Sequence, residues 1–251
     1  TCALPISFNE TVGPRTEKLG YKPAHTYVSG RVIDGVGGGI CQVSSTLYNA
    51  VLRSELEVIE RRNHTFTVGY VPYGLDATVS YGSQDFKFRN STNWPIKIIA
   101  EVTKDNYMVF TFIGTKENPE RKVSLSHKII KTIPHDTKYI DDNTLEKGKT
   151  KVIQRGKDGY VVDAYKTVTV GGKVVSKEKI STSRYIPLVE IIARGTKEVE
   201  PGDSVQTITK PVDTVSPTDR AATPVPSPAA SPSAPATPVF VPKPEPTIGV
   251  D

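Results

Sequence analysis

The sequence predicts an α+β protein with three parts: an N-terminal domain in which a helix packs on an antiparallel sheet, a small all-β module, and a disordered Pro-rich tail. One helical pattern occurs near residue 40, and strand patterns fill most of the chain from there to about residue 197. After residue 200 the chain carries 12 of its 20 prolines. The predicted boundaries are residues 1–118, 123–197 and 201–251.

The helix is predicted to begin where a run of glycines meets a cysteine, in "DGVGGGICQVSSTLYNAVLR". Apolar residues then recur at three- and four-residue spacing, which is the pattern of a helix with one buried face. These residues are Ile40, Val43, Leu47, Ala50 and Val51.

Strand patterns follow the helix, because apolar residues alternate with polar ones or form short runs. The predicted strands are Leu56–Glu60, His64–Val71, Asp76–Tyr81, Asp85–Asn90, Pro95–Val102 and Tyr107–Gly114. The same two-residue period continues in the second part, where Gly171 and Gly172 separate "YKTVTV" from "KVVSKEKI" and predict a tight hairpin.

The last part, with "AATPVPSPAASPSAPATPVFVPKPEP", has too little large apolar surface to repay the entropy of ordering, so a disordered spacer is predicted. No window of the chain approaches the roughly 18 consecutive apolar residues of a membrane helix, so no membrane span is expected, although an anchor upstream is compatible with the sequence. The net charge of +5 favours anionic surroundings. Because the basic residues are dispersed among acidic ones, nucleic acid is not an expected partner, and an anionic cell wall suits the charge better.

Cys41 is the predicted nucleophile. Unpaired N–H groups and the helix dipole make the start of a helix positive, which favours a thiolate. Gly37, Gly38 and Gly39 leave room for a substrate backbone, and N–H groups near Gly39, together with Gln42, are candidates for binding an oxyanion.

A thiolate that transfers acyl groups also needs a proton carrier, and His64 is the candidate. Asp76 is predicted to orient the His64 ring, with Asp85 as the alternative. The order of helix, His strand and carboxylate strand is the one that papain-like and transglutaminase-like cysteine enzymes use, which is an analogy of arrangement. Arg61 and Arg62 precede His64, and one of them, Arg62 in the interpretation favoured here, is a candidate for binding a substrate carboxylate.

Simpler interpretations remain open. Cys41 could be a small buried hydrophobic residue or could form a disulfide with Cys2, and His64 could be a structural histidine. The glycine run lacks the Lys-Ser/Thr of a phosphate-binding loop. No metal and no cofactor are expected, because the other histidines lie far from Cys41 at no spacing typical of metal ligands.

The first part resembles the VanW family in "FNETVGPRTEKLGYKPAHTY", in the stretch from "GVGGGICQVSSTLYN" to "DATV", and in "DFKFRNSTNWPIKI". This resemblance implies an extracytoplasmic, Gram-positive cell-wall protein connected with vancomycin resistance. It also implies L,D-transpeptidation of peptidoglycan with Cys41 as the nucleophile. The opening "TCALPISFNE" departs from the family pattern, so a truncated or divergent N-terminus is expected.

The second part resembles the G-five domain, with matching glycines at Gly148, Gly156, Gly159, Gly172 and Gly195. That resemblance implies an extracellular module that binds polymers containing N-acetylglucosamine.

Together the two parts predict a cysteine L,D-transpeptidase that acts on tetrapeptide stems, with peptidoglycan stem peptides and glycan as partners. A noncatalytic wall-binding protein is the alternative, and hydrolysis by the same residues is a third possibility.

Overall fold

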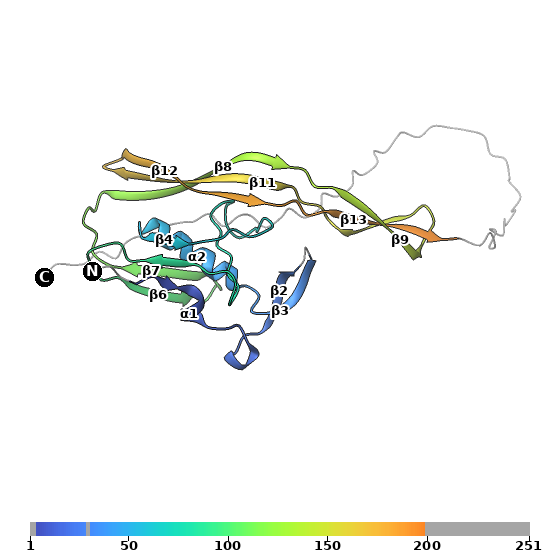
Figure 1. Cartoon of the computed structure of the whole chain (residues 1–251), viewed down its shortest axis with the longest axis horizontal. Coiled ribbons are helices and arrows are strands. Elements are labelled where there is room, and N and C mark those ends of the chain that lie inside the picture. Colours follow the sequence, from blue (N-terminus) through green and yellow to red (C-terminus); the bar gives the residue numbers. More distant parts are fainter. Residues whose placement is uncertain (1–3, 29–30, 199–251) are drawn as a thin grey trace, which may run out of the picture. The chain divides into compact units, whose positions relative to one another are not determined.

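A computed structural model describes residues 4–28 and 31–198, and no side chain between residues 25 and 34 is described. Figure 1 labels most of the elements. In chain order they are β1 (Ile6–Ser7), α1 (Phe8–Val12), the 3-10 helix η1 (Glu17–Leu19), β2 (Pro23–Val28), β3 (Arg31–Val36), α2 (Ile40–Arg53), β4 (Glu57–Glu60), β5 (Lys87–Arg89), β6 (Lys97–Val102), β7 (Met108–Ile113), β8 (Arg121–Ile133), β9 (Thr137–Glu146), β10 (Thr150–Gln154), β11 (Gly159–Val170), β12 (Lys173–Tyr185) and β13 (Glu190–Lys197). The predicted tail, residues 201–251, lies outside the described residues.

The predicted helix is confirmed as α2. Its apolar stripe faces the core, where Leu47 and Val51 are buried and Ile40 and Val43 pack against the buried cluster. The helix contacts β4 and β7 (Figure 1), so a helix does cover strands in the N-terminal part of the chain. Its first residues, including Cys41, are thereby fixed relative to the core.

The strands around α2 are antiparallel. One sheet has the order β1-β5-β4, while β6 with β7 and β2 with β3 each form a two-stranded pair. Four of the predicted strands correspond to β4, β5, β6 and β7, each within a few residues of the predicted ends. The aromatic side chains of Phe8, Phe86 and Phe88 are buried with α2 in one core.

Two predicted strands, His64–Val71 and Asp76–Tyr81, are wrong. The segment from 61 to 79 runs without ladder pairing, and side chains bind much of its backbone instead. Ser44 Oγ donates to the carbonyl of Ala77 at 2.6 Å, and the N–H of Ala77 donates to Ser45 Oγ at 2.9 Å. The alternating pattern therefore reflects burial against the polar edge of α2, since backbone groups can be satisfied by side chains as well as by a neighbouring strand.

The second part, which we call the β-module (residues 121–197), contains only strands among its regular elements. One antiparallel sheet has the order β12-β11-β8, and in the other β13 pairs antiparallel with β10 and parallel with β9. The predicted hairpin is confirmed, with Val170 opposite Lys173 and both intervening glycines at positive φ. At Gly195 an added Cβ would lie 1.9 Å from the carbonyl oxygen of Glu146, so only glycine fits there.

Candidate active site

Cys41 is the second residue of α2, and its thiol is free and half-buried. Gly39 caps the helix with a φ of 88°, in the left-handed region that favours glycine. The N–H groups of Gln42 and Val43 both donate to the Gly39 carbonyl, at 3.0 and 3.4 Å. Among the described residues no hydrogen bond uses the N–H of Cys41, which leaves a donor beside the sulfur.

The sulfur of Cys41 is surrounded by polar groups of the loop that lies along α2. The N–H and the carbonyl oxygen of Val79 each lie 3.5 Å from Sγ, and Thr78 Oγ1 lies 3.6 Å from it. Burial acts to raise the pKa of Cys41, but the hydrogen bond with His64 and the N–H of Val79 outweigh burial, so the pKa of the thiol is lowered. These contacts favour the thiolate.

His64 is held by Asp76 through two hydrogen bonds. Its ring atom Nδ1 lies 2.6 Å from Asp76 Oδ2, and its backbone N–H donates to the same oxygen at 2.7 Å. Burial opposes the charged ring, yet the hydrogen bonds to Asp76 and Cys41 raise the pKa of His64 to about 9. A raised pKa on the imidazole and a lowered one on the thiol both favour a thiolate–imidazolium pair.

Asp76 is only 1% exposed and is held at both oxygens. Tyr185 Oη lies 2.5 Å from Oδ1, and the Arg61 guanidinium lies 3.1 Å from the same oxygen. Burial acts against the charge, but hydrogen bonding to His64 and the charge of Arg61 hold the pKa of Asp76 below its usual value. A buried carboxylate with this set of partners stays ionised and orients the histidine.

The structure thus brings together the three residues predicted as nucleophile, proton carrier and orienting carboxylate, and their catalytic roles stay a prediction. Asp85, the alternative carboxylate, lies elsewhere and accepts from Ser7 Oγ at 2.5 Å and from the N–H of Asn9 at 3.0 Å. It stabilises the start of α1 and makes no contact with His64 among the described residues.

Arg61 and Arg62 differ in burial and in their partners. Arg61 is 7% exposed and is committed to Asp76, to the carbonyl of Gly74 and to Ser183 Oγ. Arg62 is exposed, which is compatible with the predicted binding of a substrate carboxylate. That role, like those predicted for Gly38, Gly39 and Gln42, stays a prediction.

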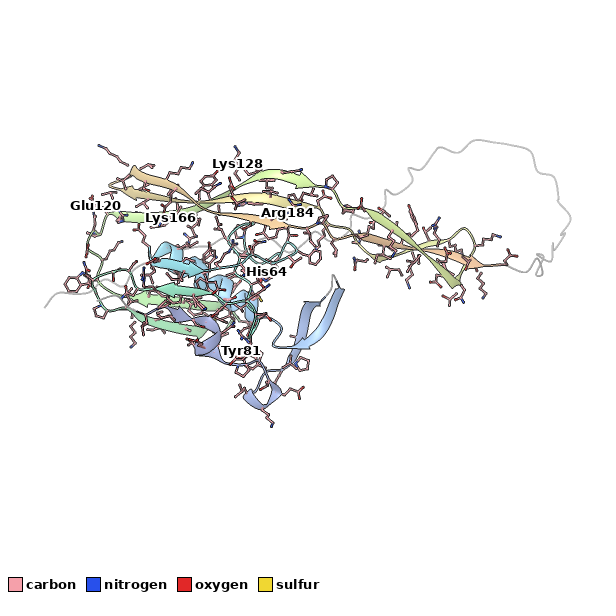
Figure 2. All side chains as sticks on the ribbon, viewed as in Figure 1. His64, Tyr81, Glu120, Lys128, Lys166 and Arg184 are labelled. Carbon is pink, nitrogen blue, oxygen red and sulfur yellow. The ribbon has the colours of Figure 1, made fainter. Side chains whose placement is uncertain are left out.

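Sequence reasoning missed Tyr70 as part of the site. Its hydroxyl lies 3.2 Å from His64 Nε2, the ring atom on the side away from Asp76. The side chain is 41% exposed, so it borders both the histidine and solvent. Figure 2 marks His64 among the side chains of the chain.

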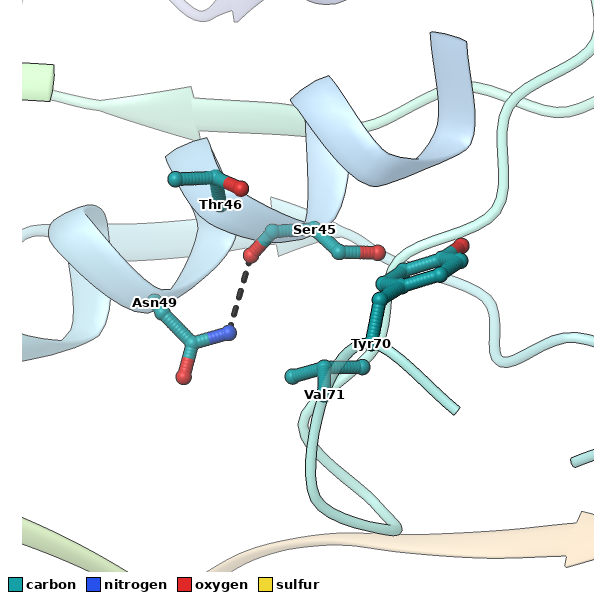
Figure 3. A pocket seen from close by; sticks show the side chains of 5 residues that line it. All are labelled: Ser45, Thr46, Asn49, Tyr70 and Val71. Atoms are coloured by element: carbon teal, nitrogen blue, oxygen red, sulfur yellow. Dashed lines mark hydrogen bonds between the residues drawn. The ribbon is translucent and has the colours of Figure 1, made fainter. Parts of the chain in front are cut away.

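A small hollow of about 180 Å³ lies one helical turn beyond Cys41. Figure 3 shows its lining by Ser45, Thr46, Asn49, Tyr70 and Val71. Residues spaced by four share one face of a helix, so Cys41, Ser45 and Asn49 form a row.

Hydrogen bonds order the wall of this hollow. Asn49 Nδ2 donates to the carbonyls of Ser45 (2.8 Å) and Leu75 (2.7 Å), which leaves its Oδ1 as the acceptor. Tyr70 lines the hollow, and its hydroxyl also lies beside His64.

Among the side chains that the structure describes, which leave out residues 25–34, no three His, Cys, Asp or Glu side chains converge as a metal site would require. None of the described helices has the length and apolarity to cross a membrane. The predicted alternative of a Cys2–Cys41 disulfide involves Cys2, which lies outside the described residues.

Comparison with known families divides the chain in two. The family described as "VanW like protein" matches residues 5–113, and the G5 domain family matches residues 126–197. The chain therefore carries a VanW-like domain followed by a G5 domain, as the sequence predicted.

Two curated relatives match part of the chain. An uncharacterized protein of Bacillus subtilis, YoaR, is 57% identical over 96 residues, which are 38% of this chain and 32% of the relative. The vancomycin B-type resistance protein VanW of Enterococcus faecalis is 29% identical over 133 residues, which are 51% of this chain and 48% of the relative. The chain thus spans about a third of the length of one relative and about half of the length of the other.

Two solved G5 domain structures match about a third of the chain. The IgA1 protease G5 domain is 26% identical and covers 33% of this chain and 99% of its own, with a TM-score of 0.22. The G5 domain of HP0197 is also 26% identical and covers 30% of this chain and 99% of its own, with a TM-score of 0.18.

Proposed function

Because the chain carries a VanW-like domain followed by a G5 domain, we propose that it is an extracytoplasmic, peptidoglycan-modifying cysteine L,D-transpeptidase that acts on tetrapeptide stems. The observation that supports this proposal is the hydrogen-bonded His64–Asp76 pair beside Cys41, where His64 and Cys41 each shift the pKa of the other. The relatives in Bacillus subtilis and Enterococcus faecalis favour the cell wall of a Gram-positive bacterium as its location.

The proposed reaction begins when the Cys41 thiolate attacks the carbonyl carbon of the third stem residue. The N–H of Cys41, which no described residue accepts, would face the oxyanion together with the N–H of Gly39. The His64 imidazolium gives its proton to the amine of the departing D-Ala as the C–N bond breaks, and a thioester remains on Cys41.

A second stem completes the cycle. Its side-chain amine attacks the thioester and gives a proton to the neutral His64, and the C–S bond breaks to return the thiolate. Asp76 stabilises the imidazolium in the first state and holds the ring in one orientation in the second. Water in place of the amine would give hydrolysis with the same residues.

The test uses purified disaccharide-tetrapeptide and the full chain, with products measured by mass spectrometry. The proposal predicts release of D-Ala and formation of a crosslinked dimer, both lost in Cys41→Ala and both retained in Cys2→Ala, the matched control. D-Ala release without dimer indicates hydrolysis. If Cys41 is intact and neither D-Ala nor dimer forms, the proposal is contradicted.

A noncatalytic wall-binding protein is the second candidate, favoured by the match to the G5 domain and by the net charge of +5. Sedimentation with purified peptidoglycan separates the two candidates. Both predict binding that survives Cys41→Ala, but only the first predicts product from the unaltered chain.

A further inference from the structure

We propose that Tyr185 of the β-module is a positioning residue of the N-terminal active site, whose hydroxyl holds the Asp76 carboxylate in the orientation that pairs with His64. This inference deepens the proposed function and rests on it. It makes the β-module a part of the catalytic centre in addition to any role in binding the wall.

The hydrogen bonds of Tyr185 determine which way its proton points. Its side chain, at the end of β12, is 1% exposed. The hydroxyl accepts the N–H of Gly74 at 2.7 Å, and its oxygen lies 2.5 Å from Asp76 Oδ1. Because an N–H can only donate, the hydroxyl proton is free for Asp76.

A second contact from the same strand supports the same oxygen. Arg61 donates to Asp76 Oδ1 through Nη2 at 3.1 Å and to Ser183 Oγ through Nη1 at 2.9 Å. Ser183 is buried and precedes Tyr185 by two residues, so both lie on one face of β12. Tyr185 of β12 thus binds Oδ1 directly, and Ser183 of the same strand supports it through Arg61. The other oxygen, Oδ2, interacts with both the ring and the backbone N–H of His64.

The β-module is attached to the loop around His64 by further contacts. The N–H of Ile186 donates to the carbonyl of Thr65 at 2.9 Å, and Asn63 Nδ2 donates to the carbonyl of Arg184 at 2.9 Å. The ring of Tyr73 stacks on that of Tyr160 with centroids 5.1 Å apart. The end of β12 is therefore fixed on the segment that carries the histidine and the carboxylate.

The titratable groups that face His64 and Asp76 are Cys41, Arg61, Tyr70 and Tyr185. Burial, together with the nearby Asp76 charge, raises the pKa of Tyr185, so its hydroxyl stays neutral and continues to donate. The pKa of Tyr70 is raised as well, first by burial and then by the charge of Cys41.

The test is Tyr185→Phe in the full chain, which removes the hydroxyl and keeps the ring. Two quantities are measured: the midpoint of the His64 titration by NMR, and the rate of Cys41 alkylation by iodoacetamide at pH 7. We expect the midpoint to fall from about 9 toward 6.5, because a carboxylate that has lost an anchor pairs less well with the ring. Alkylation is expected to slow by about 3- to 10-fold, the range for one lost hydrogen bond.

Tyr160→Phe is the matched control, because it removes a hydroxyl from the same aromatic group without touching Asp76. It should leave both readouts unchanged. Wild-type values in a folded Tyr185→Phe variant overturn the inference. If that variant does not fold, Ser183→Ala takes its place, with a smaller shift in the same direction expected and an unchanged midpoint counting against the inference. Neither readout requires peptidoglycan, so a wild-type chain without turnover would refute the proposed reaction while the titration still decides the role of Tyr185.

Discussion

Two His–Asp pairs of nearly the same geometry occur among the described residues, one beside α2 and one in the β-module. In each pair Nδ1 lies 2.6 Å from a carboxylate oxygen that also accepts the backbone N–H of the histidine. Asp76 is 1% exposed and also binds Arg61 and Tyr185, whereas the side chain of Asp158 is 36% exposed. The pKa of Asp158 is lowered chiefly by its hydrogen bond to His135.

The difference shows that a His–Asp pair alone does not make a candidate active site. His135 packs over Gly156, where an added Cβ would lie 2.0 Å from the ring, and this contact fits a structural role. His64 instead lies near enough to the Cys41 thiol, at the start of α2, to lower the pKa of that thiol. Burial, further hydrogen bonds to the carboxylate and a nearby thiol distinguish the first pair.

The largest expected difference between the pairs comes from removing each histidine. His64→Ala should lower D-Ala release by about 10³-fold or more, because the thiolate loses its cationic partner and the leaving amine its proton donor. His135→Ala, the matched control, should leave the rate unchanged. The measurement is the steady-state rate of D-Ala release by both variants. An equal loss of rate in the two variants would mean that the pairs do not differ in function.

Removing each carboxylate should separate the pairs in stability as well as in rate. Asp76→Asn leaves Arg61 buried without its charge partner, which should cost about 3 kcal/mol of the free energy of unfolding, together with up to about 10⁴-fold in kcat. Asp158→Asn removes a solvent-screened pair and should change the free energy of unfolding far less than Asp76→Asn does. Urea unfolding measures both, and similar losses would contradict the assigned difference in burial.

The pH dependence follows from the raised pKa of His64. The imidazolium is present below about pH 9, so turnover should fall on the alkaline side near that value. The same ionisation contributes stability that is complete below the ordinary His pKa of about 6.5 and is lost as pH rises through about 9. In Asp76→Asn the alkaline limit should move to lower pH. An alkaline limit of wild-type turnover near 6.5 would exclude a strong His64–Asp76 interaction.

The smallest expected effect comes from Tyr70→Phe. Loss of the hydroxyl 3.2 Å from His64 Nε2 should lower kcat/KM by about 3- to 10-fold. Tyr107→Phe is the control, because Tyr107 is exposed and lies outside the candidate site. If the two variants have the same kcat/KM, Tyr70 is not a functional part of the site.

Local patterns in the sequence were enough to predict α2, the position of Cys41 at its start, the hairpin at Gly171 and the strands of the β-module. These features depend on neighbouring residues, such as the apolar spacing along the helix and the paired glycines. Cys41, His64 and Asp76 were also identified as a group, and the structure brings their side chains together.

Features that depend on distant contacts could not be predicted. The alternation in 64–71 and 76–81 resembles strands, but the polar side chains of Ser44 and Ser45 satisfy part of the backbone. Tyr185 follows Asp76 by 109 residues, so no local pattern links them. Which of Arg61 and Arg62 binds Asp76 and which is exposed depends on the path of a loop. Neither the strand period nor the charge determines that path.

The proposed function requires that Cys41 is the nucleophile and that the buried His64–Asp76 pair supports it. The most direct measurement is an acid quench of the full chain during reaction with disaccharide-tetrapeptide, followed by mass spectrometry of the peptide that contains Cys41. We expect a thioester on Cys41 whose added mass equals the donor without D-Ala, formed far more slowly in His64→Ala than in His135→Ala. An unmodified Cys41 in a chain that releases D-Ala, or an adduct on another residue, would contradict it.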